Sequence, residues 1–305
     1  MAQTDITRSS THVSAPLTNL AIKYKVPNMV AERVFPVVSV KKEADKYYKF
    51  AKEYLVDFDT LRGPGAEAHE MPWDVSTDTY TCEEYALKRL IPKRVADNAD
   101  PPVQPAMTSV QWLKRALMLG YEQRVQAIVQ SAAVITNNAA AAAFWDAASG
   151  QDPEADVDTA KVTILRNIGI PPNAILMSYD VAQALRRWLK ATAYTTYSEY
   201  LDKNDLPPIL WGLEPIVAGA VYNTAALGQT ESLSDVWNDN VLVFYKEESP
   251  SLDAMSLGYT MRSQNWITTE WYDSPRKGTF YEVSVVQDEE LVCEAAGYLI
   301  TNCMT

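Results

Sequence analysis

One long run of apolar residues at helical spacing most strongly constrains the fold that this chain can adopt. Apolar residues recur at spacings of three and four, namely Val110, Leu113, Leu117, Tyr121, Val125, Ile128, Ala132 and Ile135. This spacing predicts one face of an α-helix, running about 40 Å from Thr108 to Ile135. Thr108 and Gln111 match a capping box at its start. Arg115, Glu122 and Arg124 lie off the apolar stripe, so we expect them on a solvated or subunit-facing side.

Residues 1–35 show little regularity, because Pro16, Pro27 and Pro36 separate short apolar patches. Such a segment is too poor in apolar periodicity to pack as a domain by itself. We therefore predict an extended arm, and we expect a chain that lacks residues 1–35 to remain folded.

A long polar excursion separates two strand-like segments. Residues 37–56 are rich in β-branched and aromatic residues and predict two strands, broken by a charged turn at 41–46. Residues 57–76 contain the turn-forming Gly63, Pro64, Gly65 and Pro72, and a returning strand is expected at 77–85. A loop of this length is uncommon inside a compact domain, so we expect the resulting hairpin to project and to act outside its own subunit.

The remainder of the chain predicts an α+β fold. We expect helices at 156–168, ending at Gly169, from Ser178 or Asp180 to 190, and near 197–204. A buried strand is expected at 174–177. Further strands are expected at 215–221, 241–245, 257–262, 266–271, 280–286 and 291–299, with a hairpin turn at 273–278.

The sequence lacks the patterns that catalysis or metal binding requires. His69-Glu70 begins like an HExxH zinc helix, but Trp73 replaces the second histidine and Pro72 breaks the helix. No phosphate-binding glycine motif or nucleophile elbow occurs. The acidic run at 152–158 lacks the glycine and the closing glutamate of a calcium loop, and predicts a turn leading into a helix. We therefore expect no catalytic residue, no cofactor and no metal.

Cysteine usage and hydropathy predict a chain that folds in a cytoplasm. Cys82, Cys293 and Cys303 fit no disulfide or metal spacing and are expected to be free thiols. The polar start of the chain is unlike a secretory signal. No run approaches the ~18 apolar residues of a membrane span.

Charge is unevenly distributed along the chain, whose net charge is −12. Residues 1–52 hold nine basic against four acidic residues, and residues 203–305 hold five against fifteen. These ends are complementary if copies of the chain pack together, or they are simply solvated faces. The overall acidity argues against tight nucleic-acid binding, which requires phosphate neutralisation, so we expect only weak contact with DNA.

Several segments, in this order, resemble one known family. They are VFPVVSV at 34–40 with KYYKF at 46–50, RGPG at 62–65, YTCEEYAL at 80–87, Trp145, IPPNAILMS at 170–178, WGLEPIV at 211–217 and the segment 235–245. Together they are similar to the major capsid protein of tailed bacteriophages, which has the Hong Kong 97-type shell fold.

This resemblance implies a domain division and an assembly. Residues 1–44 would form an N-terminal arm and residues 45–100 an extended β-hairpin, called the E-loop in this family. Residues 101–150 and 255–290 would form a peripheral domain with the long spine helix, and residues 151–254 and 291–305 an axial domain. Hexamers and pentamers would close an icosahedral shell around double-stranded DNA, assembled in the bacterial host cytoplasm as part of the virion.

The resemblance also implies partners. No long, charged, helical segment precedes the arm, so we expect a separate scaffold protein, together with a portal and, as an option, decoration proteins, and no membrane contact. Some family members join their subunits through an E-loop lysine, but residues 53–87 contain none, so we expect a non-covalent shell.

Candidate contact residues follow from this expectation. Basic groups would meet acidic groups of a neighbour, and apolar groups would be buried against it. The two sets are Lys41, Lys42, Lys46, Lys49 and Arg62, and Leu55, Phe58, Met71 and Trp73. The alternatives are an encapsulin-like cellular compartment, which shares the fold, and, more remotely, a soluble enzyme of unfamiliar type.

Overall fold

The computed structural model describes residues 12–24, 26, 28–49, 61–65, 67, 76–99, 104–203, 205–226, 228–247, 249 and 255–305. Helices and strands mix along the chain, and many of the strands pair antiparallel. The helices are α1 (Ala15–Lys23), α2 (Ala31–Val34), α3 (Lys93–Asp97), α4 (Pro105–Val129), α5 (Pro153–Ile168), α6 (Tyr179–Thr192), α7 (Tyr194–Leu201) and the 3-10 helix η3 (Glu294–Ala296). No described helix has the length and apolarity needed to cross a membrane.

Within the described residues, the strands form two five-stranded sheets and two separate hairpins. The first sheet contains β1 (His12–Val13), β2 (Val37–Ser39), β5 (Glu83–Pro92), β12 (Gly258–Asp273) and β13 (Gly278–Leu291). The second contains β6 (Asn138–Ala140), β7 (Ala174–Ser178), β8 (Glu214–Ala218), β11 (Val241–Phe244) and β14 (Gly297–Thr301). The hairpins are β3 (Ala44–Lys49) with β4 (Ser76–Thr81), and β9 (Val221–Asn223) with β10 (Leu233–Asp235).

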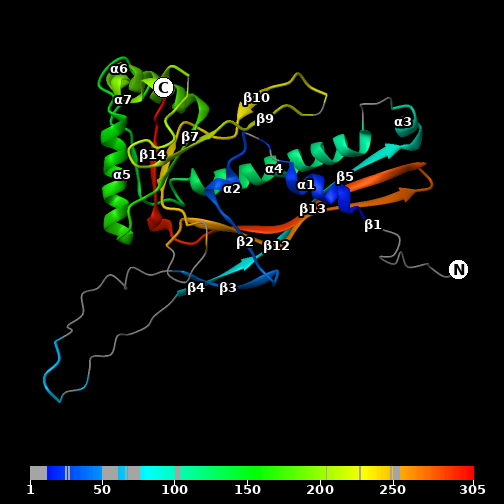
Figure 1. Ribbon diagram of the computed structural model, residues 1–305, viewed down its shortest axis with the longest axis horizontal. Coiled ribbons are helices and arrows are strands. Elements are labelled where there is room, and N and C mark those ends of the chain that lie inside the picture. The colour runs from blue at the N-terminus through cyan, green and yellow to red at the C-terminus, as the bar shows by residue number, and fades with distance from the viewer. Residues whose placement is uncertain are drawn as a thin grey trace.

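A long hairpin supports the first sheet. β12 and β13 pair along their whole length, in the order β1-β12-β13-β5, and β2 joins β12 in parallel. The strands predicted at 257–262 and 266–271 are therefore one strand, with register shifts between Arg262 and Ile267. The turn predicted at 273–278 joins β12 to β13, as expected. Figure 1 shows α4 lying along this hairpin, with α1 beside it.

The second sheet lies at one end of α4, where α5, α6 and α7 gather (Figure 1). All five residues of β7 are buried, as the apolar run at 174–177 predicted. The helix predicted from 156 begins earlier, at Pro153, because the Asp152 carboxylate accepts a hydrogen bond from the Ala155 amide at 3.2 Å. It ends at Gly169, as predicted, since that residue has a left-handed φ of 74°.

The spine helix α4 is shorter than its apolar repeat. It begins at Pro105, whose missing N–H is harmless in the first turn. Thr108 therefore lies inside the helix, and the predicted capping box at its start is wrong. The helix ends at Val129, not at Ile135, because the chain turns at Ser131, whose carbonyl accepts from the Ile135 amide at 2.8 Å. Ile135 is nevertheless fully buried, so a turn can complete an apolar face that looks helical in sequence.

The described part of the N-terminal segment packs into the body. The prediction that residues 1–35 form an irregular extended arm is therefore wrong for this part of the chain. α1 and α2 lie within it, and Val30, Ala31, Val34 and Phe35 are almost completely buried in the main core. The Phe35 ring lies against the backbone at Gly258, where an added Cβ would come within 2.7 Å of the ring. Gly258 is therefore required by this close approach.

Two charged side chains of α4 hold the same segment. The Lys114 ammonium donates to the carbonyl of Tyr24 at 2.6 Å, just after the end of α1. Glu122, about two turns further along α4, accepts from the backbone N–H groups of Val30 and Ala31 at 2.8 and 2.9 Å. Both side chains are buried.

The expected solvated side of α4 is thus only partly solvated. Arg115 is exposed, but Glu122 has no exposed surface, and Arg124 forms two hydrogen bonds with the Glu289 carboxylate at 2.7 and 2.8 Å. A polar residue off an apolar stripe is therefore not always a surface residue; here it satisfies backbone and side-chain groups inside the fold.

Removing residues 1–35 should unfold the chain, in contrast to the sequence-based expectation. The deletion strips Phe35 and Val34 from the core, at about 3–5 kcal/mol for a buried phenylalanine alone, against a total stability of about 5–15 kcal/mol. Circular dichroism melting should show no cooperative transition. A chain lacking only residues 1–11 should melt cooperatively; if both truncated chains do so, the N-terminal segment is not part of the core.

Candidate subunit-contact site

The four lysines among the basic candidate residues lie at the root of the β3–β4 hairpin. Lys41, Lys42 and Lys46 are exposed, and Lys49 is the last residue of β3. Lys42 forms a salt bridge within its own hairpin, with its Nζ 2.8 Å from the Asp45 carboxylate. This contact raises the pKa of Lys42 and lowers that of Asp45, so Lys42 already has an acidic partner in its own subunit.

The tip of the hairpin carries Leu61 and Arg62. Leu61 is 84% exposed, the highest value among the exposed large apolar side chains of the described residues, and Arg62 is exposed as well. Gly65 has a φ of 83°, a left-handed conformation that favours glycine in the turn. Leu55, Phe58, Met71 and Trp73 lie outside the described residues, and their role as apolar contacts stays a prediction.

The root of the hairpin rests on a small apolar cluster of its own. Tyr47, Tyr80 and Cys82 are buried there against residues of the long β12–β13 hairpin, namely Tyr259, Met261, Val286 and Val292 nearby. The Cys82 thiol donates to the Met261 carbonyl at 3.4 Å. The thiols of Cys82, Cys293 and Cys303 are all buried, and none of the three is part of a disulfide in this structure.

Carboxylates fix the orientation of this root. The Tyr47 hydroxyl donates to Glu290 at 3.2 Å, and the Thr81 amide donates to Asp288 at 2.7 Å. Partial burial, followed by the charge of Asp288, raises the pKa of Glu290 to about 7; the charge of Asp78 on β4 also contributes. Two carboxyl groups this close cannot both ionise cheaply, so Glu290 holds a proton at mildly acidic pH.

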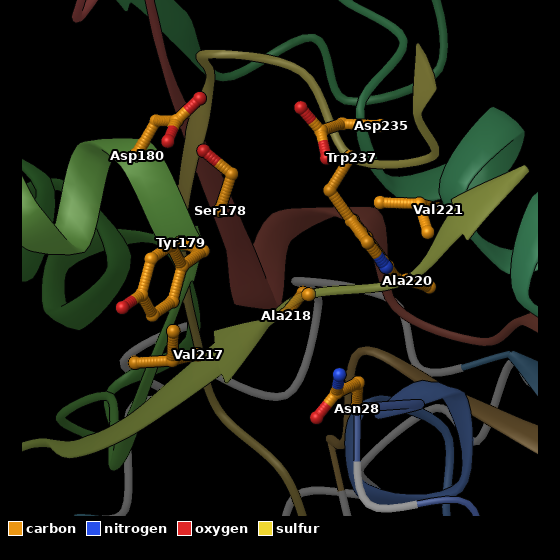
Figure 2. Close-up of a pocket in the computed structure, with 11 residues that line it drawn as sticks. Asn28, Ser178, Tyr179, Asp180, Val217, Ala218, Ala220, Val221, Asp235 and Trp237 are labelled. Carbon is orange, nitrogen blue, oxygen red and sulfur yellow. The ribbon is translucent and has the colours of Figure 1, made fainter. Parts of the chain in front are cut away.

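A pocket of about 380 Å³ lies where two parallel strands end. Ser178 ends β7 and Ala218 ends β8, and α6 begins directly after Ser178. Figure 2 shows Asp180 and Ser178 on one side of the pocket and Asp235 and Trp237 on the other, with Ala218 and Ala220 between them. The sequence pattern predicts Ser178 and Asp180 only as helix caps, because the side chains that face them come from distant segments.

Other exposed groups could make contacts between subunits. Trp112 on α4 is 58% exposed, and the Arg89 guanidinium lies 4.7 Å from the centroid of its ring. Among the described residues, no group of three or more histidine, cysteine or acidic side chains could hold a metal ion.

Comparison with known proteins identifies a consistent set of relatives, although no protein-family model matches the chain. It is 27% identical over 303 residues to a major capsid protein of Burkholderia phage BcepMu, covering 95% of this chain and 96% of that protein. It is 26% identical over 247 residues to a major capsid protein of Pseudomonas phage JBD67, covering 77% of each.

Solved structures agree with these relatives. The crystal structure of a phage-related protein from Bordetella bronchiseptica RB50 matches with a TM-score of 0.73 at 25% identity, over 95% of this chain and 97% of that one. The mature capsid of bacteriophage PhiM1 matches with a TM-score of 0.55 at 12% identity, over 91% and 88%. The SrpI encapsulin of Synechococcus elongatus PCC 7942 matches with 0.53 at 13%, over 91% and 88%. The chain therefore has the Hong Kong 97-type shell fold, and the predicted α+β fold class is confirmed.

Replacing Glu290 by glutamine should flatten the pH dependence of stability. A folded pKa of about 7, above the ordinary value near 4.5, means that the folded state binds the proton more tightly, so stability falls as pH rises from about 4.5 to about 7. Thermal unfolding of the unassembled subunit at pH 5, 6, 7 and 8 should show this fall in the wild type and a smaller one in Glu290→Gln. Glu282→Gln on the same strand is the control; equal slopes in all three chains would contradict the assignment.

Proposed function

We propose that this chain, which is a major capsid protein of the tailed-phage type, closes into an icosahedral shell of hexamers and pentamers around a double-stranded DNA genome. The observation that carries the proposal is the match over 303 residues to a phage major capsid protein, together with the shared shell fold. Its relatives are structural proteins, so the prediction that the chain is not an enzyme is confirmed and the soluble-enzyme alternative falls.

The shape of the subunit supports assembly from its own copies. The β3–β4 hairpin has a root that packs on the body and a tip, residues 61–65, that lies far from it in Figure 1. A tip with an 84% exposed leucine buries little apolar surface within its own subunit. Heterologous contacts between unlike surfaces of identical chains close into rings when their rotation permits, and such rings are the capsomers of the proposed shell.

The two sheets support the proposed domain division, but not at every strand. β5, from the range 45–100, pairs with β13 in the first sheet, and β6, from the range 101–150, pairs with β14 in the second. The sheet built on β12 and β13, with α4, belongs to the peripheral domain that we place at 101–150 and 255–290. The sheet that contains β7 and β11, with α5 and α6, belongs to the axial domain that we place at 151–254 and 291–305. The assignments of 1–44 to an arm and 45–100 to the E-loop are part of the same proposal, although α1, α2 and Phe35 pack on the body.

An encapsulin-like compartment is the second candidate. An encapsulin shares the fold, at 13% identity, whereas both curated relatives are phage capsid proteins at twice that identity. We therefore favour the phage shell. Particles purified from the natural source should contain DNA if the chain is a phage capsid and a protein cargo if it is an encapsulin.

The chain is a component of the virion shell, and it associates with itself. Beyond this, we propose that it assembles in the cytoplasm of a bacterial host with a separate scaffold protein and a portal, with decoration proteins as optional partners. Contact with the packaged DNA is proposed to be weak and non-specific, since the net charge is −12.

Purified protein should form closed particles. Sedimentation velocity should show species much larger than the 34.0 kDa chain, and negative-stain microscopy should show shells. Val125→Pro, which breaks the buried face of α4 at a cost of about 3 kcal/mol or more, is a control that should yield neither shells nor stable subunits. A monodisperse monomer in every condition, with the scaffold protein supplied, would falsify the assembly proposal.

The particles should be held together without covalent bonds. Residues 53–87 contain no lysine, and the next one along, Lys88, lies in β5 with its ammonium 5.8 Å from the ring centroid of Trp271. Mature particles boiled in detergent and reductant should therefore give a single band near 34 kDa. A ladder of oligomers on the same gel would contradict this prediction.

A further inference from the structure

The pocket at the end of β7 and β8 has charges without partners. It is lined by the carboxylates of Asp180 and Asp235 and by no basic residue. Both acidic residues are exposed, and neither forms a hydrogen bond or ion pair with another described residue. Two carboxylates facing one hollow attract a cation, and a planar guanidinium suits them best because it can donate to two carboxylates at once.

The walls of the same pocket are apolar. Val217, Ala218 and Ala220 line it, and the side chains of Tyr179 and Val221 at its rim are 57% and 46% exposed. Leu233 lies on the same strand as Asp235, β10, and is 68% exposed. A hollow with apolar walls and two acidic groups fits a ligand that has a cationic end and an apolar body.

An unpartnered hydroxyl on a largely buried serine is a second, independent indication that the pocket can receive a ligand. Ser178 is only 7% exposed, yet its hydroxyl forms no hydrogen bond with any described residue, not even as the cap of α6. Figure 2 shows this hydroxyl on the side of the pocket where the Asp180 carboxylate lies. Four side-chain atoms of the described residues are fully buried without a partner, and the Ser178 oxygen is not one of them. This oxygen is therefore open to the pocket, where an incoming donor can bond to it.

We propose that this pocket receives the hairpin tip of a second copy of the chain, with Arg62 between Asp180 and Asp235 and Leu61 against the apolar wall. The inference rests on the proposed function, since it names one contact of the assembled shell. Arg62 is the only charged residue between 61 and 65, and Leu61 beside it supplies the apolar body that the pocket walls require.

The geometry of the tip favours an intersubunit contact. In Figure 1 the tip lies well away from α6, at the opposite side of the molecule, so the two surfaces of one chain do not meet in this structure. An added Cβ at Gly63 or Gly65 would meet no atom within 4 Å, which leaves the tip backbone open to approach by another surface. The tip and the pocket are unlike surfaces, as a heterologous contact requires.

Engineered cysteines test the contact directly in assembled particles. Particles of Arg62→Cys with Asp235→Cys, treated with a short bismaleimide cross-linker, should give about tenfold more linked dimer and higher oligomers than a control pair. A linker is needed because an arginine–carboxylate contact holds the two Cβ atoms farther apart than the ~4 Å that a direct disulfide requires. The control is Arg62→Cys with Glu199→Cys, because Glu199 is an exposed carboxylate on α7. The native cysteines are buried and contribute little background.

Charge reversal tests the chemistry of the same contact. Arg62→Glu alone, and Asp180→Arg with Asp235→Arg, should each reduce the yield of particles about tenfold or more, while the combined chain should recover most of it. Melting of the unassembled subunits should be unchanged, because all three residues are exposed.

The outcomes separate this inference from the proposed function. Wild-type shells in which the Arg62–Asp235 pair cross-links no better than the control, and in which charge reversal is not rescued, would overturn the inference and leave the capsid function intact. A wild-type chain that forms no particles at all would overturn both. Normal assembly of Arg62→Glu, with free arginine bound by the wild-type pocket and not by the Asp180→Arg, Asp235→Arg chain, would assign the pocket to a small cationic ligand and would likewise overturn the tip contact.

Discussion

The buried carboxylate of Glu122 is the interaction on which the arrangement of this subunit depends. It accepts hydrogen bonds from the amides of Val30 and Ala31 and from the indole of Trp237 at 2.8 Å, so one side chain joins α4, the N-terminal segment and the loop before β11. Burial raises the pKa of Glu122, although its three donors act in the opposite direction. Without this carboxylate, each buried N–H left unpaired would cost about 1–3 kcal/mol.

The position of the hairpin follows from that anchor. Once α2 is fixed, Phe35 packs on Gly258, and β2 pairs with the start of β12. The chain then enters β3 beside the β12–β13 hairpin, where Tyr47 and Glu290 meet. A second polar network supports the same region: Arg124 binds Glu289 and stacks 3.7 Å from the centroid of the Tyr85 ring. The root of the hairpin is thus held by groups that originate on α4.

The apolar side chains and carboxylates that remain exposed on the subunit explain how it can assemble. Its core and its buried polar groups are almost fully paired among the described residues, and the exceptions are few. Apolar side chains such as Leu61 and Trp112, and the carboxylates around the pocket, remain exposed on the surface of the subunit. Each exposed ion pair contributes only about 0–1 kcal/mol, so stability of the proposed shell depends on many repeated contacts and on buried apolar area.

The sequence by itself determined the class of fold, the main elements and the family resemblance. The apolar run of β7, the glycine that ends α5 and the β12–β13 turn are local signals, readable because each depends on residues a few positions apart. Only the tertiary structure decided that Lys114 and Glu122 are internal, that α1, α2 and Phe35 belong to the body and that Ser178, Asp180 and Asp235 share a pocket. In each case the partners are separated by tens of residues, and a polar side chain carries no mark in sequence of whether its partner is water or a distant backbone group.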